Sequence, residues 1–171
     1  MGPVQRVLTP PPKPTAIMQE VLPVGPACAF CGILDGRTPA HVVHRAAGSM
    51  AFLDARPLFL GHTLLVPRRH VLTLADLPGA DVPEFFGLAQ RLERAVVRAT
   101  DADGSLVLVN NVVSQSVPHM HLHVIPRRRG DGLRFWLGPR RRYDSEEHAA
   151  ATAEAIAARL AGGQTTREGD A

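Results

Sequence analysis

The 171-residue chain has only two cysteines, few aromatic side chains and no long apolar run. Two cysteines cannot build a disulfide-rich scaffold. No stretch approaches the roughly 18 to 20 apolar residues that cross a bilayer, and the N-terminus lacks the basic segment and apolar run of a signal peptide. We therefore expect a cytoplasmic protein with no membrane partner.

Lysine is almost absent, because Lys13 is the single lysine among 19 basic residues and the others are arginine. Together with 15 prolines, this bias is typical of a GC-rich genome, so a net charge of +3 does not indicate a nucleic-acid partner. A hydrophobic content of 45% and a mean hydropathy of −0.01 are enough for the core of one compact domain.

The chain is predicted to consist of one domain between two loose ends. Seven prolines in residues 1–26 predict a flexible, extended arm, and the polar residues 163–171 predict a flexible tail. The domain, 27–162, includes a basic loop at 127–143. The arginines and Trp136 of this loop either contact a polyphosphate and a base or form a solvated surface.

Hydrophobic periodicity and turn residues predict a mixture of helices and strands. A helical turn at 28–35 is expected to end at Gly36. Asp81 and Ser145 are expected to cap the longer helices. The predicted strands span 41–45, 50–53, 63–66, 106–109 and 120–125, and the predicted long helices span 82–100 and 145–161.

Three histidines, His119, His121 and His123, alternate with apolar residues near the end of the predicted domain. Alternate side chains of a strand share a face, so the three imidazoles are expected to line one face with apolar side chains behind them. Imidazole titrates near neutral pH. A row of three therefore indicates metal ligation or nucleophilic and acid–base chemistry.

The two cysteines, Cys28 and Cys31, have the spacing of zinc ligands. One such pair supplies only half of a tetrahedral site. A thiol redox pair and two idle thiols remain alternatives, although the βαβ pattern that accompanies a redox pair is missing.

The segment His-Met-His-Leu-His-Val-Ile at 119–125 resembles the signature of the histidine triad (HIT) superfamily. Segments 51–57, 61–70 and 109–111 resemble further motifs of that family, in the same order. The resemblance implies an α+β fold with a five-stranded, mainly antiparallel sheet, one long helix, a short N-terminal helical turn and a C-terminal helix. It also implies a homodimer whose sheet continues across the interface.

The resemblance also implies the chemistry. His121 would attack the α-phosphorus of a purine nucleotide, such as a dinucleoside polyphosphate or a nucleoside phosphoramidate, and water would resolve the nucleotidyl-histidine intermediate. Fixed hydrogen bonds would stabilise the phosphoryl charge, so catalysis would need no divalent metal. The supporting residues implied are His123 and His62 at the phosphate and leaving group, Gln115 and Ser116 at phosphate oxygens, Asp54 at the ribose, and Asn110 near the ribose and phosphate.

The same resemblance implies a structural zinc site. In related proteins two histidines complete a Cys₂His₂ set, and the matching residues here are His70 and His119. With Cys28 and Cys31 they would tie the N-terminal turn to the sheet.

The chain departs from many relatives at Val112-Val113-Ser114, where those relatives have a glycine-rich loop on the leaving-group side. Substrate preference therefore does not transfer with the motif. Three alternatives stay open: a nucleotidyl transferase or phosphorylase that uses inorganic phosphate, a nucleotide-binding scaffold with weak turnover, and a nucleic-acid deadenylase.

Overall fold

The computed structural model describes residues 28–133 and 142–162. The chain divides into two compact units, one through Asp131 and one from Gly132 onward. The predicted arm 1–26, the predicted tail 163–171 and Trp136 lie outside the described residues. Among the helices that the structure describes, none has the length and apolar character needed to cross a membrane.

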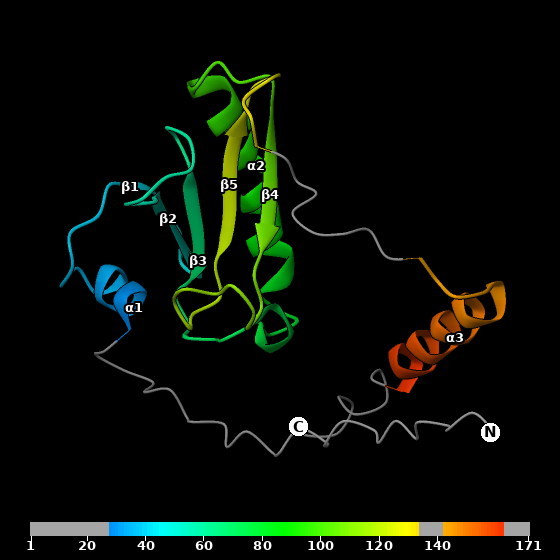
Figure 1. The fold of residues 1–171 in the computed structure, drawn as a ribbon. Helices are drawn as coiled ribbons and strands as arrows, with labels where there is room; N and C mark the ends of the chain where they lie inside the picture. Colours follow the sequence, from blue (N-terminus) through cyan, green and yellow to red (C-terminus); the bar gives the residue numbers. More distant parts are fainter. Residues whose placement is uncertain (1–27, 134–141, 163–171) are drawn as a thin grey trace, which may run out of the picture. The chain divides into compact units, whose positions relative to one another are not determined.

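The first unit is built on a five-stranded antiparallel sheet (Figure 1). Its strands lie in the order β1-β2-β3-β5-β4, and every neighbouring pair is antiparallel. The sheet confirms the predicted α+β class. The strands are β1 Val42–Arg45, β2 Ser49–Leu53, β3 Thr63–Pro67, β4 Gly104–Val109 and β5 Leu122–Arg127.

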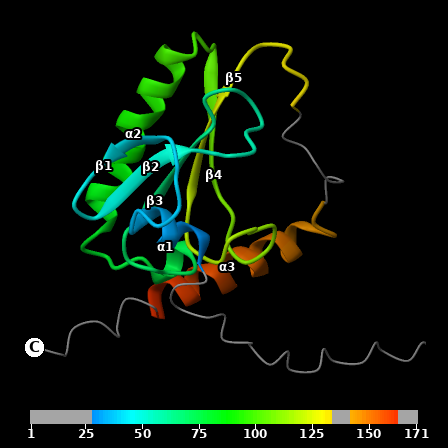
Figure 2. The ribbon, with the colours of Figure 1, turned by 90° about the vertical axis from the view of Figure 1, so that its left-hand side faces the viewer.

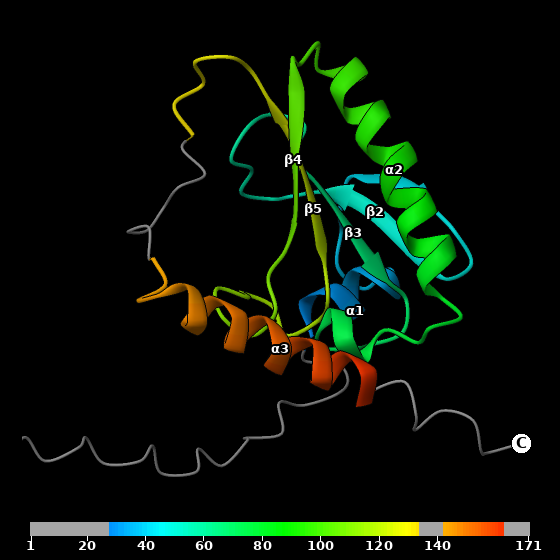
Figure 3. The same cartoon turned by 90° about the vertical axis from the view of Figure 1, so that its right-hand side faces the viewer.

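The long helix α2, Val82–Ala99, lies along the sheet (Figure 3). Its buried positions recur at helical spacing: Phe85, Leu88, Ala89, Leu92 and Val96. Asp81 precedes the helix as predicted, but its side chain makes no capping bond because its backbone is already helical, with φ −86° and ψ −17°. Only its carbonyl contributes, accepting from the Phe85 N–H at 3.0 Å.

The two faces of the sheet carry different cores. Ala51, Leu65 and Leu122 pack with the buried residues of α2 on one face. Phe52 and Leu64 pack on the other face with α1, Ala29–Leu34, which lies beside the β1–β2 hairpin (Figure 2). The central strands β2, β3 and β5 are buried on both sides over most of their length, which explains their continuous apolar sequences.

Two shorter elements and the second unit complete the structure. Gly36 ends α1 with a φ of +76°, as predicted. The sequence reading missed a 3₁₀ turn, η1 Leu74–Asp76. In the second unit, α3 spans Glu146–Gly162, and the predicted Ser145 cap accepts from the His148 N–H at 3.1 Å.

The strand predicted at 120–125 begins two residues later. Pairing of β3 with β5 ends at Leu65 and Leu122, and the Met120 N–H donates instead to the Val71 carbonyl at 2.7 Å. His119 and His121 therefore precede the ladder. The predicted alternation survives, because Met120 packs in the α2-facing core while the His119 and His121 rings contact Phe30 of α1.

Candidate functional site

The ring of His121 is held in one tautomer by the backbone. Its Nδ1–H donates to the His119 carbonyl at 2.7 Å, so the lone pair of the neutral ring lies on Nε2. The side chain is buried and lines a pocket of about 740 Å³. A neutral imidazole with a free Nε2 lone pair is suited to act as a nucleophile.

A second pair of rings lies beside it. The Leu58 N–H donates to His62 Nδ1 at 3.3 Å, which leaves His62 Nε2–H to donate to His123 Nδ1 at 3.0 Å. In this tautomer His123 carries its own proton on Nε2, which is buried and has no hydrogen-bond partner among the described residues. This N–H is a free donor at the pocket that His123 lines.

Both rings of this pair are neutral at pH 7. Burial, and after it the neighbouring His121 and His62, lower the pKa of His123 to about 4. Burial also lowers the pKa of His62, although nearby Asp54 opposes the shift. The Asp54 Oδ2 lies 3.5 Å from His62 Nδ1, and its Oδ1 accepts from the Arg56 N–H at 2.8 Å.

The pocket beside these histidines has apolar walls and a polar end. It lies on the α1-facing side of the sheet, and its size falls in the ordinary range for small-molecule sites. Its polar lining includes Asp54, Ser116, His121 and His123, and its apolar lining includes Phe30, Ile33, Phe52 and Leu64.

Three of the residues predicted for catalysis and nucleotide binding lie outside this lining: His62, Gln115 and Asn110. The Gln115 side chain is engaged elsewhere: its Oε1 accepts from the Val112 N–H at 2.9 Å, and its Nε2 donates to the Leu72 carbonyl at 2.7 Å. Asn110 follows β4 and is half-buried. The roles predicted for these three residues stay predictions.

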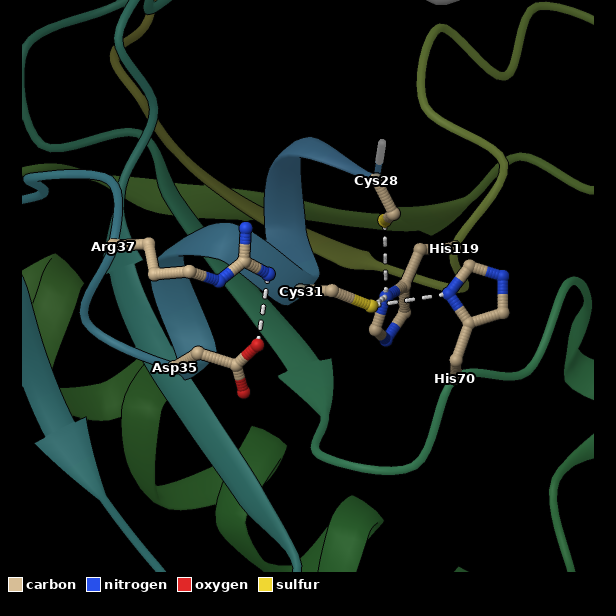
Figure 4. A network of polar contacts seen from close by, with 6 residues as sticks. All are labelled: Cys28, Cys31, Asp35, Arg37, His70 and His119. Atoms are coloured by element: carbon tan, nitrogen blue, oxygen red, sulfur yellow. Dashed lines mark hydrogen bonds and ion pairs between the residues drawn. The ribbon is translucent and has the colours of Figure 1, made fainter. Parts of the chain in front are cut away.

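The four predicted metal ligands come together at the other end of the histidine row (Figure 4). The Cys31 Sγ lies 3.2 Å from His70 Nδ1 and 3.7 Å from His119 Nδ1. The Cys28 Sγ lies 3.6 Å from the same His119 nitrogen. A tetrahedral zinc ion with Zn–S of about 2.3 Å and Zn–N of about 2.0 to 2.1 Å has ligand–ligand edges of about 3.3 to 3.8 Å. The cluster therefore has close to the dimensions that zinc requires.

The surroundings of the cluster favour a metal as well. The His119 Nε2–H donates to the Pro67 carbonyl at 2.8 Å, which aims its Nδ1 lone pair at the thiols. Burial lowers the pKa of His119 to about 4 and, ahead of the hydrogen bond with Cys28, raises the pKa of the Cys31 thiol to about 11. Zinc binds the thiolate form of cysteine, so a metal ion that enters the cluster displaces the thiol protons.

Asp54, His62 and His123 also offer a set of atoms that could hold a metal. The direct hydrogen bond between the two rings satisfies the facing nitrogens without an ion. The geometry therefore favours a proton-sharing pair here and a metal at the cysteine cluster.

Comparison with known families gives a match to the HIT domain over residues 35–130, which is more than half of the chain. This chain belongs to the HIT family. Its fold agrees, since solved HIT-family structures superpose on it, among them one from Bacillus subtilis with a TM-score of 0.70 and 27% identity, covering 85% of this chain and 100% of the other.

Relatives of this HIT protein include enzymes. An uncharacterised HIT-like protein of Mycobacterium tuberculosis is 37% identical over 124 residues, covering 71% of this chain and 86% of the relative. The adenosine 5'-monophosphoramidase of Saccharomyces cerevisiae is 32% identical, covering 73% and 78%. A bis(5'-nucleosyl)-tetraphosphatase of Schizosaccharomyces pombe is 31% identical, covering 54% and 52%. The named activities are nucleotide hydrolyses. The relatives therefore support a function at the level of this general reaction class.

One solved structure is relevant to the cluster of two cysteines and two histidines. A zinc-bound histidine triad protein from Mycobacterium smegmatis is 37% identical to this HIT chain, with a TM-score of 0.60, covering 77% of this chain and 97% of the other.

Sequence reasoning missed the pocket walls of this HIT protein. Phe30, Phe52 and Leu64 have the spacing of ordinary core residues, so nothing in the sequence marks them as a binding surface. His41 also lines the pocket, and it lies outside the motifs that marked the other histidines. The carbonyls of Pro67 and His119 orient two imidazoles, and a sequence carries no signal for such backbone acceptors.

Proposed function

We propose that this protein is a nucleotidyl hydrolase that acts at the α-phosphate of a purine nucleoside phosphoramidate or dinucleoside polyphosphate. The observation that carries the proposal is the fixed tautomer of His121, which leaves the Nε2 lone pair free on a ring that lines the pocket. The enzyme names of the relatives support the reaction class.

The pocket supports a nucleotide in one orientation. The base contacts apolar wall residues such as Phe30 and Ile33, and the Asp54 carboxylate accepts from ribose hydroxyls. The phosphate then lies at the histidine end of the pocket. There the unpartnered His123 Nε2–H donates to a phosphoryl oxygen.

The reaction has two displacements. In the first, the His121 Nε2 lone pair forms a bond to the α-phosphorus, and the bond from phosphorus to the leaving nitrogen or oxygen breaks. The leaving atom keeps the electron pair and takes a proton that the exposed Ser116 hydroxyl, which lines the pocket, relays from water. The His119 carbonyl stabilises the positive ring through its bond from Nδ1–H. In the second, water attacks the phosphorus and loses a proton to solvent through the Ser116 hydroxyl, the electron pair of the P–N bond returns to Nε2, and a nucleoside monophosphate is released.

The hydrogen-bonded pair of His62 and His123 stabilises the negative charge that develops on the phosphoryl group. Both rings are neutral at pH 7, so His123 donates its Nε2–H without adding a fixed charge, while His62 orients the His123 ring through the bond to its Nδ1. Gln115 would have to leave its bonds to Val112 and Leu72 in order to reach a phosphate oxygen. Asn110 would approach the ribose and phosphate from the end of β4.

The test is turnover of adenosine 5'-phosphoramidate and of diadenosine tetraphosphate, with and without inorganic phosphate. His121→Asn is expected to lower the rate at least 10³-fold, as on the order of 10³ to 10⁶ is typical for the loss of a nucleophile. The matched control is His44→Asn, since His44 is exposed on β1 and outside the pocket lining. Equal turnover by the wild type and His121→Asn would refute the proposal.

The phosphorylase alternative is resolved in the same experiment. If phosphate resolves the intermediate, the product is a nucleoside diphosphate and appears only when phosphate is present. If water resolves it, the product is the monophosphate in both conditions. Nucleotide binding without turnover of either substrate would favour the scaffold alternative.

We also propose that Cys28, Cys31, His70 and His119 hold a structural zinc ion, which cross-links α1 to the segments that follow β3 and precede β5. The supporting observations are the sulfur–nitrogen distances and the Pro67 bond that orients His119. Purified protein is expected to contain one equivalent of zinc by metal analysis. Cys31→Ser is expected to lose most of that zinc and to melt at a lower temperature, whereas His44→Asn changes neither. Less than half an equivalent in the wild type, with an unchanged melting temperature in Cys31→Ser, would refute the zinc site.

We propose further that two chains pair along β4. Among the strands that the structure describes, β4 lies at the edge of the sheet with β5 as its one neighbour, and Val107 on it is 44% exposed. An unpaired strand edge readily adds another strand. Light scattering is expected to give twice the chain mass of 18.4 kDa. A mass of one chain at micromolar concentration would contradict the pairing.

A further inference from the structure

Phe30 lies between the two cysteines in the sequence and between two sites in space. Its ring is 5.1 Å from the His121 ring and 6.0 Å from the His119 ring, measured between centroids. It also packs edge-on against Phe52 at 5.5 Å. One side chain therefore touches the proposed nucleophile, a proposed metal ligand and a wall of the pocket.

Few other interactions hold the helix that carries Phe30 in place. α1 has only six residues, and no side chain caps its N-terminal end. A helix this short is not stable by itself. Besides apolar packing, α1 is attached to the fold through the thiols of Cys28 and Cys31 at His70 and His119, which lie beside its first turn (Figure 4).

The same helix forms a wall of the nucleotide pocket. Ala29, Phe30 and Ile33 all line it, facing β-strand residues such as Phe52 and Leu64. Since the metal ligands Cys28 and Cys31 lie on either side of Phe30 in the sequence, closing the cluster sets the position of this wall. If α1 moves, the apolar slot widens and the Phe30 ring leaves His121.

We propose that the Cys₂His₂ cluster controls nucleotide affinity, with Phe30 as the positioning residue that couples the two sites. The inference rests on the function and the zinc site proposed above. The metal would act on binding of the nucleotide rather than on the displacement at phosphorus, because its ligands lie outside the pocket lining.

Coupling between two binding sites is reciprocal, so the nucleotide must tighten zinc by the same factor by which zinc tightens the nucleotide. Couplings of this kind are commonly about 5- to 150-fold. We expect about a tenfold effect here, because one aromatic wall of the pocket is displaced while the strand wall stays in place.

The experiment measures equilibrium binding and needs no turnover. The probe is adenosine 5'-monophosphate, titrated calorimetrically into full-length zinc-loaded protein and into protein stripped by a chelator. Zinc affinity is measured separately by chelator competition, with and without saturating monophosphate. Circular dichroism checks that the stripped protein is folded.

The variants separate coupling from plain destabilisation. In Phe30→Ala the coupling factor is expected to fall to about one, with monophosphate binding weak whether or not zinc is present. Phe30→Leu keeps part of the wall and is expected to restore part of the coupling. The matched control is Phe85→Leu, a buried phenylalanine of α2 on the opposite face, which is expected to lose stability but keep the wild-type coupling factor.

Several results would overturn the inference. An unchanged monophosphate affinity in folded, zinc-free wild type would do so alone, leaving the proposed function intact. If stripped protein unfolds, the competition measurement decides, because coupling through global unfolding would persist in Phe30→Ala and the proposed coupling would not. Failure of the zinc-loaded wild type to bind monophosphate would overturn the proposed function and this inference together.

Discussion

Replacing Val112 by glycine is expected to stabilise the protein. Val112 has a φ of +66°, a left-handed conformation that is rare for a β-branched residue. It is the central residue of a tight turn in which the Val113 N–H donates to the Asn111 carbonyl at 2.7 Å. The side chain is 75% exposed, so removing it gives up little burial.

The size of the effect follows from two opposing contributions. A left-handed conformation costs a residue with a side chain roughly 1 to 2 kcal/mol, and a β-branched residue lies near the upper end. Glycine costs about 0.4 to 1 kcal/mol more than a residue with a side chain, because its unfolded chain is more flexible. The difference is a gain of about 1 kcal/mol, which raises the melting temperature of a domain of this size by about 4 °C.

The neighbouring residue provides the control. Val113 is 79% exposed but is not among the described residues with a positive φ, so Val113→Gly is expected to lose about 0.4 to 1 kcal/mol. Urea unfolding followed by circular dichroism measures both. Destabilisation of Val112→Gly by as much as Val113→Gly would refute the argument that Val112 stores strain.

Two further predictions concern titration and capping. Because burial lowers the pKa of His123 to about 4, the unfolded chain binds a proton that the folded chain does not between its ordinary value of 6.5 and about 4. The free energy of unfolding should therefore be fully retained above pH 6.5 and fall as the pH drops through that window. Urea unfolding at a series of pH values measures this free energy. Its slope against pH should be shallower in His123→Asn than in the wild type, and an identical slope would contradict the burial argument. Asp76→Ala removes the acceptor of two bonds from Thr73, its N–H at 2.9 Å and its hydroxyl at 2.7 Å, and should cost about 1 kcal/mol in the same assay. Asp81→Ala is the control, since the Asp81 side chain makes no cap bond.

Much of the fold follows from local pattern. The periodicity of α2 and the apolar strands predicted their elements, because each reflects burial on a fixed face. The spacing of Thr73 and Asp76 is a capping signature that could have predicted η1. The first residue of β5 could not be predicted, since it depends on where β3 stops pairing and on a distant carbonyl at Val71.

Some features of the candidate site could likewise be predicted from the sequence, and others could not. Histidine alternation placed the imidazoles on one face, and the resemblance to the HIT family named the ligands that the structure brings together. The Gln115 amide could not be placed, because it bonds to backbone groups of Leu72 and Val112. The conformation of Val112 likewise depends on the path of the whole loop and not on its own residue type.

The two acceptors that orient His119 and His121 are main-chain carbonyls, one at Pro67 and one at His119 itself. No side-chain substitution can delete a carbonyl, so random mutation cannot easily reverse which nitrogen of either ring is protonated. The same property limits transplantation. A designer who grafts the histidine motif onto another strand moves the imidazoles but leaves the Pro67 carbonyl behind, and must rebuild the path of β3 to regain it.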